Sequence, residues 1–260
     1  MVLVGVIFIS GGGIYKIEKE SYVLRLALER RGIMELEDEA HADYWARKGW
    51  TNTIEKLHID FDVAFFGNSI TRGSDFQQVF KDKKIINLGY SGDNMLGMQR
   101  RVSMLTAANP KKVFIMAGTN DLVHIDLEEY KKRYDNLLSA ITDSLPNTNV
   151  YVESVLPTNH YVGKGNYAPN SKVIKANEIA RSLCKKYHCT YIDLYRLYVG
   201  ADGELKETYT KDGVHLFPKH YDKWSNAIRP YIYISVMFNY NLFIWKNFYL
   251  QEELASSDET

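Results

Sequence analysis

The sequence predicts an α/β protein in which helices cover both faces of a five-stranded parallel sheet. Five short apolar runs with β-branched and aromatic residues recur along the chain, at residues 61–67, 84–89, 112–118, 149–157 and 190–195. Between them, apolar residues follow the period of a helix, most clearly at 126–145 and 170–187. This alternation is typical of a three-layer α/β/α domain with flavodoxin-like winding.

Composition and charge exclude several classes of protein. The chain has 260 residues, of which 45% are hydrophobic and 25% charged, as in ordinary globular domains. Lys and Arg total 32 and Asp and Glu also total 32, so the basic excess typical of nucleic-acid binding is absent. Two cysteines exclude a disulfide scaffold or a multi-cysteine zinc site. We therefore expect no nucleic-acid partner, metal or cofactor.

Residues 1–16 form an apolar N-terminal segment ahead of the main domain, which we place at residues 61–232. Residues 1–15 carry no charge but fall short of the roughly 20 residues that cross a bilayer. A membrane anchor is one interpretation, and a buried strand or a loose hydrophobic end are the others. An anchor would favour the cell envelope or periplasm, while the basic residues that follow favour a cytoplasmic domain.

Two further segments flank the main domain. Residues 17–60 combine a helix-compatible pattern with an acidic run, and we expect a mostly helical wrap there. Residues 233–260 form an aromatic C-terminal extension and a tail. Asn239, Asn241 and Lys246 interrupt the extension and argue against a transmembrane span.

Polar residues that suit acyl transfer follow the predicted strands. Ser69 comes after the first strand, Gly92 after the second and Asn120 after the third, while Asp212 and His215 precede the last helix of the domain. A serine needs a base to become a nucleophile, and histidine oriented by a carboxylate is the usual base. Backbone N–H groups and an asparagine amide can hold an oxyanion. Because parallel strands end at one edge of a sheet, the sequence predicts a hydrolase site there.

Each of these residues taken alone has an ordinary structural interpretation. Ser69 could cap a helix, Asn120 and Gly92 could serve turns, and His215 could be a structural histidine. Ser91 lies in a run, GYSGD, that resembles the nucleophile elbow of other hydrolases but lacks its final glycine. Only the ordered combination at successive strand ends favours a catalytic site.

The runs GNSIT, GYSGDN, GTND and DGVH, in this order, resemble the four signature blocks of the SGNH (GDSL-type) esterase and acylhydrolase family. The resemblance covers roughly residues 61–232 and implies the SGNH hydrolase fold. It implies Ser69 as nucleophile, with Asp212 and His215 completing a catalytic triad. It also implies an oxyanion hole made by Ser69, Gly92 and Asn120.

One residue departs from the family pattern, because Asn68 stands where an aspartate commonly precedes the serine. We expect the substrate rim to include Asn68, His124, Asn159 and His160. The expected activity is cleavage of short-chain esters, acetyl esters above all, on a small-molecule or carbohydrate alcohol through an acyl-enzyme. The alternatives are a lysophospholipase or lipase, a non-catalytic glycan-binding protein of the same fold, and a membrane-attached scaffold.

Overall fold

Five parallel strands form the centre of the structure, a computed structural model that describes residues 56, 59–163 and 165–233. In the order β2-β1-β3-β4-β5, they are β2 (Ile85–Gly89), β1 (Val63–Gly67), β3 (Lys112–Met116), β4 (Asn149–Glu153) and β5 (Thr190–Ile192). Every neighbouring pair is parallel. This is the flavodoxin-like strand order, so the predicted fold is confirmed.

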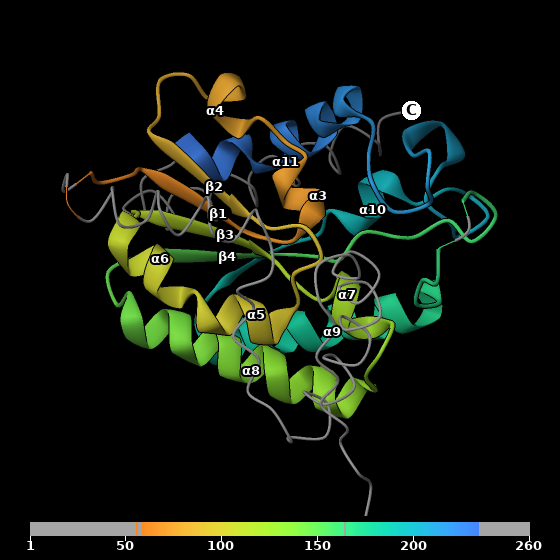
Figure 1. Ribbon diagram of the computed structural model, residues 1–260, viewed down its shortest axis with the longest axis horizontal. Coiled ribbons are helices and arrows are strands. Elements are labelled where there is room, and N and C mark those ends of the chain that lie inside the picture. The colour runs from red at the N-terminus through yellow and green to blue at the C-terminus, as the bar shows by residue number, and fades with distance from the viewer. Residues whose placement is uncertain (1–55, 57–58, 164, 234–260) are drawn as a thin grey trace, which may run out of the picture. The chain divides into compact units, whose positions relative to one another are not determined.

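Helices cover both faces of the sheet (Figure 1). One layer contains α3 (Ser69–Arg72), α4 (Phe76–Val79), α10 (Tyr195–Tyr198) and α11 (Tyr221–Tyr233). The other contains α5 (Met95–Arg100), α6 (Val102–Ala108), α8 (Leu127–Ser144) and α9 (Asn170–Lys186). The short helix α7 (Thr119–Leu122) follows β3, and two 3-10 turns occupy Glu207–Tyr209 and Pro218–His220.

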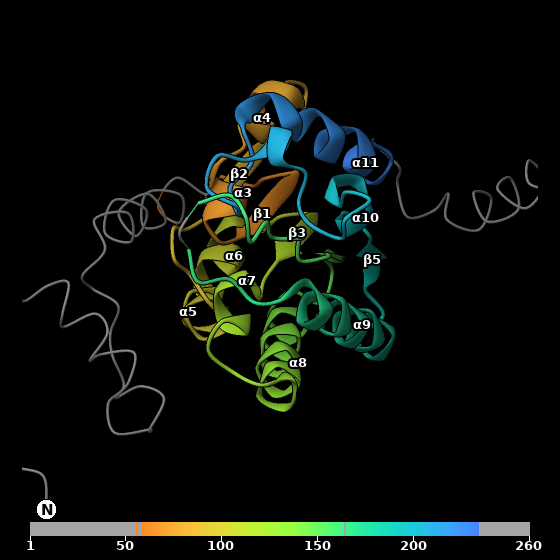
Figure 2. The same cartoon turned by 90° about the vertical axis from the view of Figure 1, so that its right-hand side faces the viewer.

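The register of the sheet brings the carboxyl ends of β1, β2 and β3 to one level. Gly67, the last residue of β1, pairs with Gly89 of β2 and with Met116 of β3. The segments that follow these three strands therefore leave the sheet side by side. In two perpendicular views, α3 and α7 lie at the same end of the sheet (Figures 1 and 2).

The helix α8 shows how the sequence produces the outer layers. Asp126 accepts a hydrogen bond from the Glu129 N–H at 2.9 Å and so caps the N-terminus of the helix. Five apolar or aromatic side chains of α8 recur at helical spacing and are buried: Tyr130, Tyr134, Leu137, Leu138 and Ile141. Burial of this stripe fixes α8 against the sheet and its neighbours.

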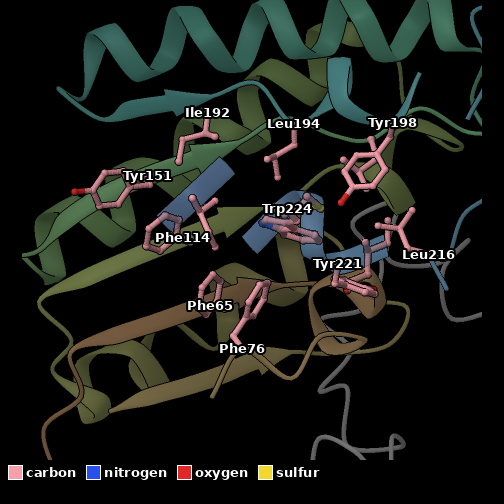
Figure 3. Close-up of a cluster of buried hydrophobic side chains, with 14 of the residues drawn as sticks. Phe65, Phe76, Phe114, Tyr151, Ile192, Leu194, Tyr198, Leu216, Tyr221 and Trp224 are labelled. Atoms are coloured by element: carbon pink, nitrogen blue, oxygen red, sulfur yellow. The ribbon is translucent and has the colours of Figure 1, made fainter. Parts of the chain in front are cut away.

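An aromatic stack fills the space between the sheet and α11 (Figure 3). Phe114 of β3 lies between Phe65 of β1 and Tyr151 of β4, with ring centroids 5.1 and 4.6 Å away. Phe76 of α4 stacks on Phe65 at 3.7 Å, and its ring meets the edge of Trp224 of α11 at 5.4 Å. Side chains alternate between the two faces of a strand, so the neighbouring Phe66 packs on the opposite side.

Two strands end earlier than the apolar runs predict. β4 stops at Glu153, although the run continues to residue 157, and β5 stops at Ile192. The cause is Ser154, whose Oγ accepts hydrogen bonds from the backbone N–H groups of Leu194 and Tyr195 at 2.8 and 2.7 Å. These two groups bond a side chain instead of a neighbouring strand, so the ladder ends there.

Several predictions concern residues outside the described ones. The apolar segment 1–16, with its proposed membrane attachment through residues 1–15, lies outside them entirely. The predicted wrap at 17–60 also lies outside the described residues, apart from residues 56, 59 and 60. The same holds for the extension at 233–260, apart from Tyr233, which ends α11. These interpretations of the flanking segments stay predictions. In the described part of the chain, none of the helices has both the length and the apolar character of a membrane span.

A buried acid at the end of β4 makes the stability of the fold depend on pH. The carboxyl of Glu153 lies in the core and accepts a hydrogen bond from Trp224 Nε1 at 2.6 Å. Burial raises the pKa of Glu153 to about 8, outweighing the lowering effect of that bond. Since the unfolded pKa is near 4.5, the folded state holds a proton that the unfolded state releases.

Replacing this acid with a neutral amide, Glu153→Gln, should remove part of the pH dependence of folding. In the natural chain the stabilising contribution of the protonated acid is complete below about pH 4.5 and is lost as pH rises through about 8. Its loss lowers the free energy of unfolding by up to about 1.4 kcal/mol per pH unit. Urea denaturation across this range should give a flatter slope for the variant. Parallel slopes would show that Glu153 titrates normally.

Candidate active site

Ser69 is the first residue of α3 and lies directly beyond the carboxyl end of β1. Asn68 caps this helix, because its Oδ1 accepts a hydrogen bond from the Ile70 N–H at 2.9 Å. An aspartate would offer the same kind of acceptor oxygen, so asparagine at position 68 preserves the cap. The N–H of Ser69 stands at the open end of the helix, where backbone donors have no intrahelical acceptor.

The structure brings Ser69, His215 and Asp212 into one hydrogen-bonded chain, although 146 residues separate the first two. Oγ of Ser69 lies 2.8 Å from Nε2 of His215, and Nδ1 of the same ring lies 2.7 Å from Oδ2 of Asp212. When Nδ1 carries the proton that faces the carboxylate, Nε2 is an acceptor for the serine hydroxyl. This arrangement can activate a serine as a nucleophile.

Backbone donors hold the carboxylate of Asp212 in place. Its Oδ1 accepts hydrogen bonds from the N–H groups of Val214 and His215 at 3.1 and 2.8 Å. Partial burial raises the pKa of Asp212, but the hydrogen bonds from the His215 backbone, its ring and Val214 outweigh that effect and lower it to about 2. The carboxylate is therefore ionised at neutral pH and keeps the imidazole in the tautomer that accepts the serine proton.

The loop that carries Asp212 and His215 packs against the segment that follows β4. The N–H of Asn159 donates to the carbonyl oxygen of Gly213 at 2.8 Å, and the hydroxyl of Tyr167 donates to the carbonyl oxygen of Asp212. Gly213 has a φ of +88°, a left-handed conformation that favours glycine. This turn places the carboxylate beside the imidazole three residues later.

The other two predicted oxyanion donors come from the segments after β2 and β3. Asn120 of α7 donates from Nδ2 to the carbonyl oxygen of Asp93 at 2.7 Å, which leaves its second amide hydrogen for another acceptor. Gly92 precedes Asp93 in the turn before α5, with a φ of +75°. Asn120 lies in the same pocket wall as Ser69, whereas Gly92 is not among the described residues that line this pocket.

A pocket of about 160 Å³ opens beside the serine. Its lining combines apolar side chains, from Leu122, Val123, Val155, Ala168, Val173 and Val214, with polar ones, from Ser69, Thr119, Asn120, Thr158, Asn166, Tyr167 and His215. Apolar walls with a few converging polar groups are typical of small-molecule sites. In the described part of the chain, no three His, Cys, Asp or Glu side chains group as ligands for a metal ion.

The four residues expected at the substrate rim lie outside the lining of this pocket. Asn68 and Asn159 are buried, and the side chain of Asn159 donates to the carbonyl oxygen of Leu205 at 2.7 Å. His160 lies near the surface with Nδ1 2.8 Å from Glu204 Oε2. His124 is exposed just beyond the end of α7.

Asn166, Tyr167 and Ala168 line the pocket instead, from the segment between β4 and α9 that also carries Asn159 and His160. The sequence predicted Asn159 and His160 of this segment at the substrate rim, but not the three residues that line the pocket. The amide of Asn170 decides which residues face inward, because it exchanges hydrogen bonds with the N–H and carbonyl of Thr158 at 2.9 and 2.8 Å. These bonds close the loop, and no spacing pattern in the sequence signals them.

Comparison with protein families gives one match over the described residues. The sequence model of the GDSL-like Lipase/Acylhydrolase family matches residues 65–223, a range that contains all five candidate catalytic and oxyanion residues. No curated protein sequence matches the chain.

Solved structures resemble this chain at low sequence identity. A proposed acylhydrolase from Bacteroides fragilis is 24% identical, with a TM-score of 0.63 over 76% of this chain and 98% of its own. A GDSL-like lipase from Bacteroides thetaiotaomicron is 26% identical, with a TM-score of 0.58 over 65% of this chain and 86% of its own. The acetyl xylan esterase AlAXEase is 21% identical, with a TM-score of 0.52 over 64% of this chain and 98% of its own.

Adding a methyl group at Gly213 should destabilise the loop that carries the histidine. Its Cβ would contact the carbonyl oxygens of Asn159 and Val162, the latter at 2.6 Å. Gly203 is a matched control, since its φ is +82° and a Cβ there meets nothing within 4 Å. Gly203→Ala should cost about 1–2 kcal/mol through its backbone alone. Gly213→Ala should cost clearly more, as measured by urea unfolding, and equal losses would contradict the packing described.

Proposed function

Because the chain belongs to the GDSL-like lipase/acylhydrolase family, we propose that it is a serine esterase that removes short acyl groups, acetyl above all, from carbohydrate-type alcohols. The observation that carries the proposal is the chain of two hydrogen bonds, 2.8 and 2.7 Å long, that joins Ser69 to His215 and His215 to Asp212. A hydroxyl with a base on its proton and a carboxylate on the base is equipped for nucleophilic acyl transfer.

The reaction begins when Ser69 Oγ attacks the carbonyl carbon of the ester and Nε2 of His215 takes the hydroxyl proton. The carbonyl electrons move onto oxygen and form a tetrahedral oxyanion. As the intermediate collapses, the bond to the alcohol breaks and the imidazolium gives its proton to the leaving oxygen. Water then attacks the acyl-serine with His215 again as base, which releases the carboxylic acid and restores the Ser69 hydroxyl.

We assign stabilisation of the oxyanion to the N–H groups of Ser69 and Gly92 and to the amide of Asn120. The Ser69 N–H opens α3, and the Asn120 amide is oriented through its bond to the Asp93 carbonyl. Donors that are fixed before the reaction stabilise developing charge without reorganisation. Asp212 supports the positive imidazolium that exists at the same moment.

The size of the pocket supports a short acyl group. Its volume of about 160 Å³ is close to that of an engineered cavity of about 150 Å³ that holds benzene. Acetyl to butyryl groups therefore fit against Val155, Val173 and Val214. An octanoyl chain would extend beyond the apolar walls.

Polar surface near the triad supports a hydrophilic alcohol. The loop that packs on Gly213 exposes Tyr161, with 84% of its surface accessible, and it carries His160 near the surface. Aromatic and polar side chains on a rim suit a sugar more than a diacyl lipid. The structural neighbour described as an acetyl xylan esterase acts on an alcohol of this kind.

Removing the hydroxyl of residue 69 tests the catalytic assignment. Ser69→Ala should reduce hydrolysis of p-nitrophenyl acetate by about 10⁴-fold or more, since neither His215 nor the oxyanion donors can replace a nucleophile. Turnover is measured by the release of p-nitrophenolate, with both proteins assayed side by side under the same conditions. A variant with near-full activity would exclude Ser69 as the nucleophile.

Ser91 provides a matched control, because it also follows a strand and lies in an elbow-like run. Its Oγ bonds Arg72 Nη1 at 2.9 Å, so it has a different environment from Ser69. Ser91→Ala should retain most activity, and a fluorophosphonate should label Ser69 in both the natural chain and this variant. Absence of labelling and turnover in the natural chain would favour a non-catalytic glycan-binding protein.

A chain-length series of p-nitrophenyl esters tests the proposed acyl group. We expect kcat/KM to fall by about tenfold or more from acetyl or butyryl esters to octanoyl esters, because the longer chain leaves apolar carbon in water. A companion variant is Val173→Ala, whose smaller side chain enlarges the pocket. It should move the acyl-chain length with the highest kcat/KM toward longer chains. A preference for octanoyl or longer esters would favour a lipase or lysophospholipase instead.

A further inference from the structure

A buried arginine joins the ends of two strands behind the active site. Arg101 is only 3% exposed. Its Nη2 donates to the carbonyl oxygen of Gly67 at 2.9 Å, and its Nη1 donates to that of Leu88 at 2.8 Å. The guanidinium carbon also lies 4.2 and 4.1 Å from the ring centroids of Phe66 and Tyr90. These rings and carbonyls fix the plane of the guanidinium.

The third partner of this guanidinium is Asp93. Nε and Nη2 of Arg101 each lie 2.6 Å from Asp93 Oδ2, while Asp93 Oδ1 accepts from the Asn94 N–H at 3.1 Å. The carbonyl oxygen of Asp93 accepts a hydrogen bond from Asn120 Nδ2 at 2.7 Å. One side chain therefore reaches three segments: the end of β1, the end of β2 and the turn that precedes α5.

Two of these segments lead to groups assigned to oxyanion stabilisation, and the third such group, the amide of Asn120 in α7, bonds the turn that precedes α5. Gly67 lies two residues before Ser69, Gly92 is the neighbour of Asp93, and Asn120 bonds the carbonyl of Asp93. A shift of Asp93 would move both the Gly92 N–H and the amide of Asn120. Misplacement of about 1 Å in such a site can cost about 100-fold in rate.

We propose that Arg101 and Asp93 are positioning residues that set the geometry of the oxyanion donors. The inference rests on the proposed function, since it needs an oxyanion to be stabilised. A role in stability alone explains the pair poorly, because a buried ion pair contributes little more to folding than apolar residues of the same volume. The pair acts through Gly92 and Asn120, and it does not contact the reacting atoms.

The test uses Asp93→Asn, which keeps the shape of the side chain but has only one acceptor oxygen. That oxygen cannot serve both Arg101 and the Asn94 N–H, so the turn relaxes. We expect kcat for p-nitrophenyl acetate to fall by about 10–100-fold, with KM changed by less than about threefold. The affinity for a boronic acid, which forms a tetrahedral adduct on Ser69, should fall by a comparable factor.

The control is Asp135→Asn on α8, because Asp135 also forms an ion pair, with Lys186, and accepts a hydrogen bond from the hydroxyl of Tyr187. It should leave kcat and boronic acid affinity unchanged. Arg101→Lys is a second variant, because an ammonium cannot bond three acceptors in one plane. If Asp93→Asn does not fold, the same measurements of kcat, KM and boronic acid affinity are made on Arg101→Lys, with the same expected losses.

A double-mutant cycle separates positioning from stability. Asn120→Ala should cost about 10²–10³-fold in kcat in the natural chain, but far less in the Asp93→Asn background, where the amide is already misplaced. Additive losses would overturn the proposal, as would a lower unfolding temperature with unchanged kcat and boronic acid affinity. If the natural chain has no Ser69-dependent turnover, the proposed function itself fails. If turnover depends on Ser69 but the Asp93→Asn variant keeps its kcat and its boronic acid affinity, the positioning role is refuted and the proposed function stands.

Discussion

The hydrogen bond between Ser69 and His215 depends on the order and register of the parallel sheet. The two residues are 146 positions apart, and their Oγ and Nε2 atoms lie 2.8 Å from each other at the end of β1, which runs between β2 and β3. Its last residue is level with the ends of β2 and β3. In a fold of this type the catalytic groups can come from distant parts of the chain, since every crossover returns to the same edge.

The sequence predicted the fold, and it placed the candidate site residues at the strand ends where the structure has them, because both depend on local patterns. Buried parallel strands are apolar at nearly every position, and the runs around Phe65 and Phe114 meet that rule. Ser69 and Asn120 follow such runs directly, so their positions at the strand ends could be inferred. Asp212 and His215 are three residues apart and needed only one turn to meet. The structure therefore agrees with sequence reasoning wherever one strand or one turn decides the outcome.

Long-range contacts decide the features that sequence reasoning missed. Arg101 lies in a helical stretch with charged and polar neighbours and has the pattern of a surface residue, yet it is buried against carbonyls from two strands. Tyr167 lines the pocket because Asn170 closes its loop on Thr158. The early end of β4 depends on Ser154, which bonds a segment 40 residues away. None of these contacts leaves a periodic signal in the sequence.

The loop of Asp212 and His215 has a consequence for how recognition and chemistry relate in this protein. Its anchors are Asn159 and Tyr167, which belong to the same surface loop as the exposed Tyr161. The proposed nucleophile, Ser69, is fixed to the sheet, whereas the proposed base, His215, rests on a surface loop that we expect the alcohol to approach. A bulky alcohol that displaces this loop also displaces the imidazole from the serine. Discrimination between alcohols would therefore appear as differences in turnover number as well as in binding strength.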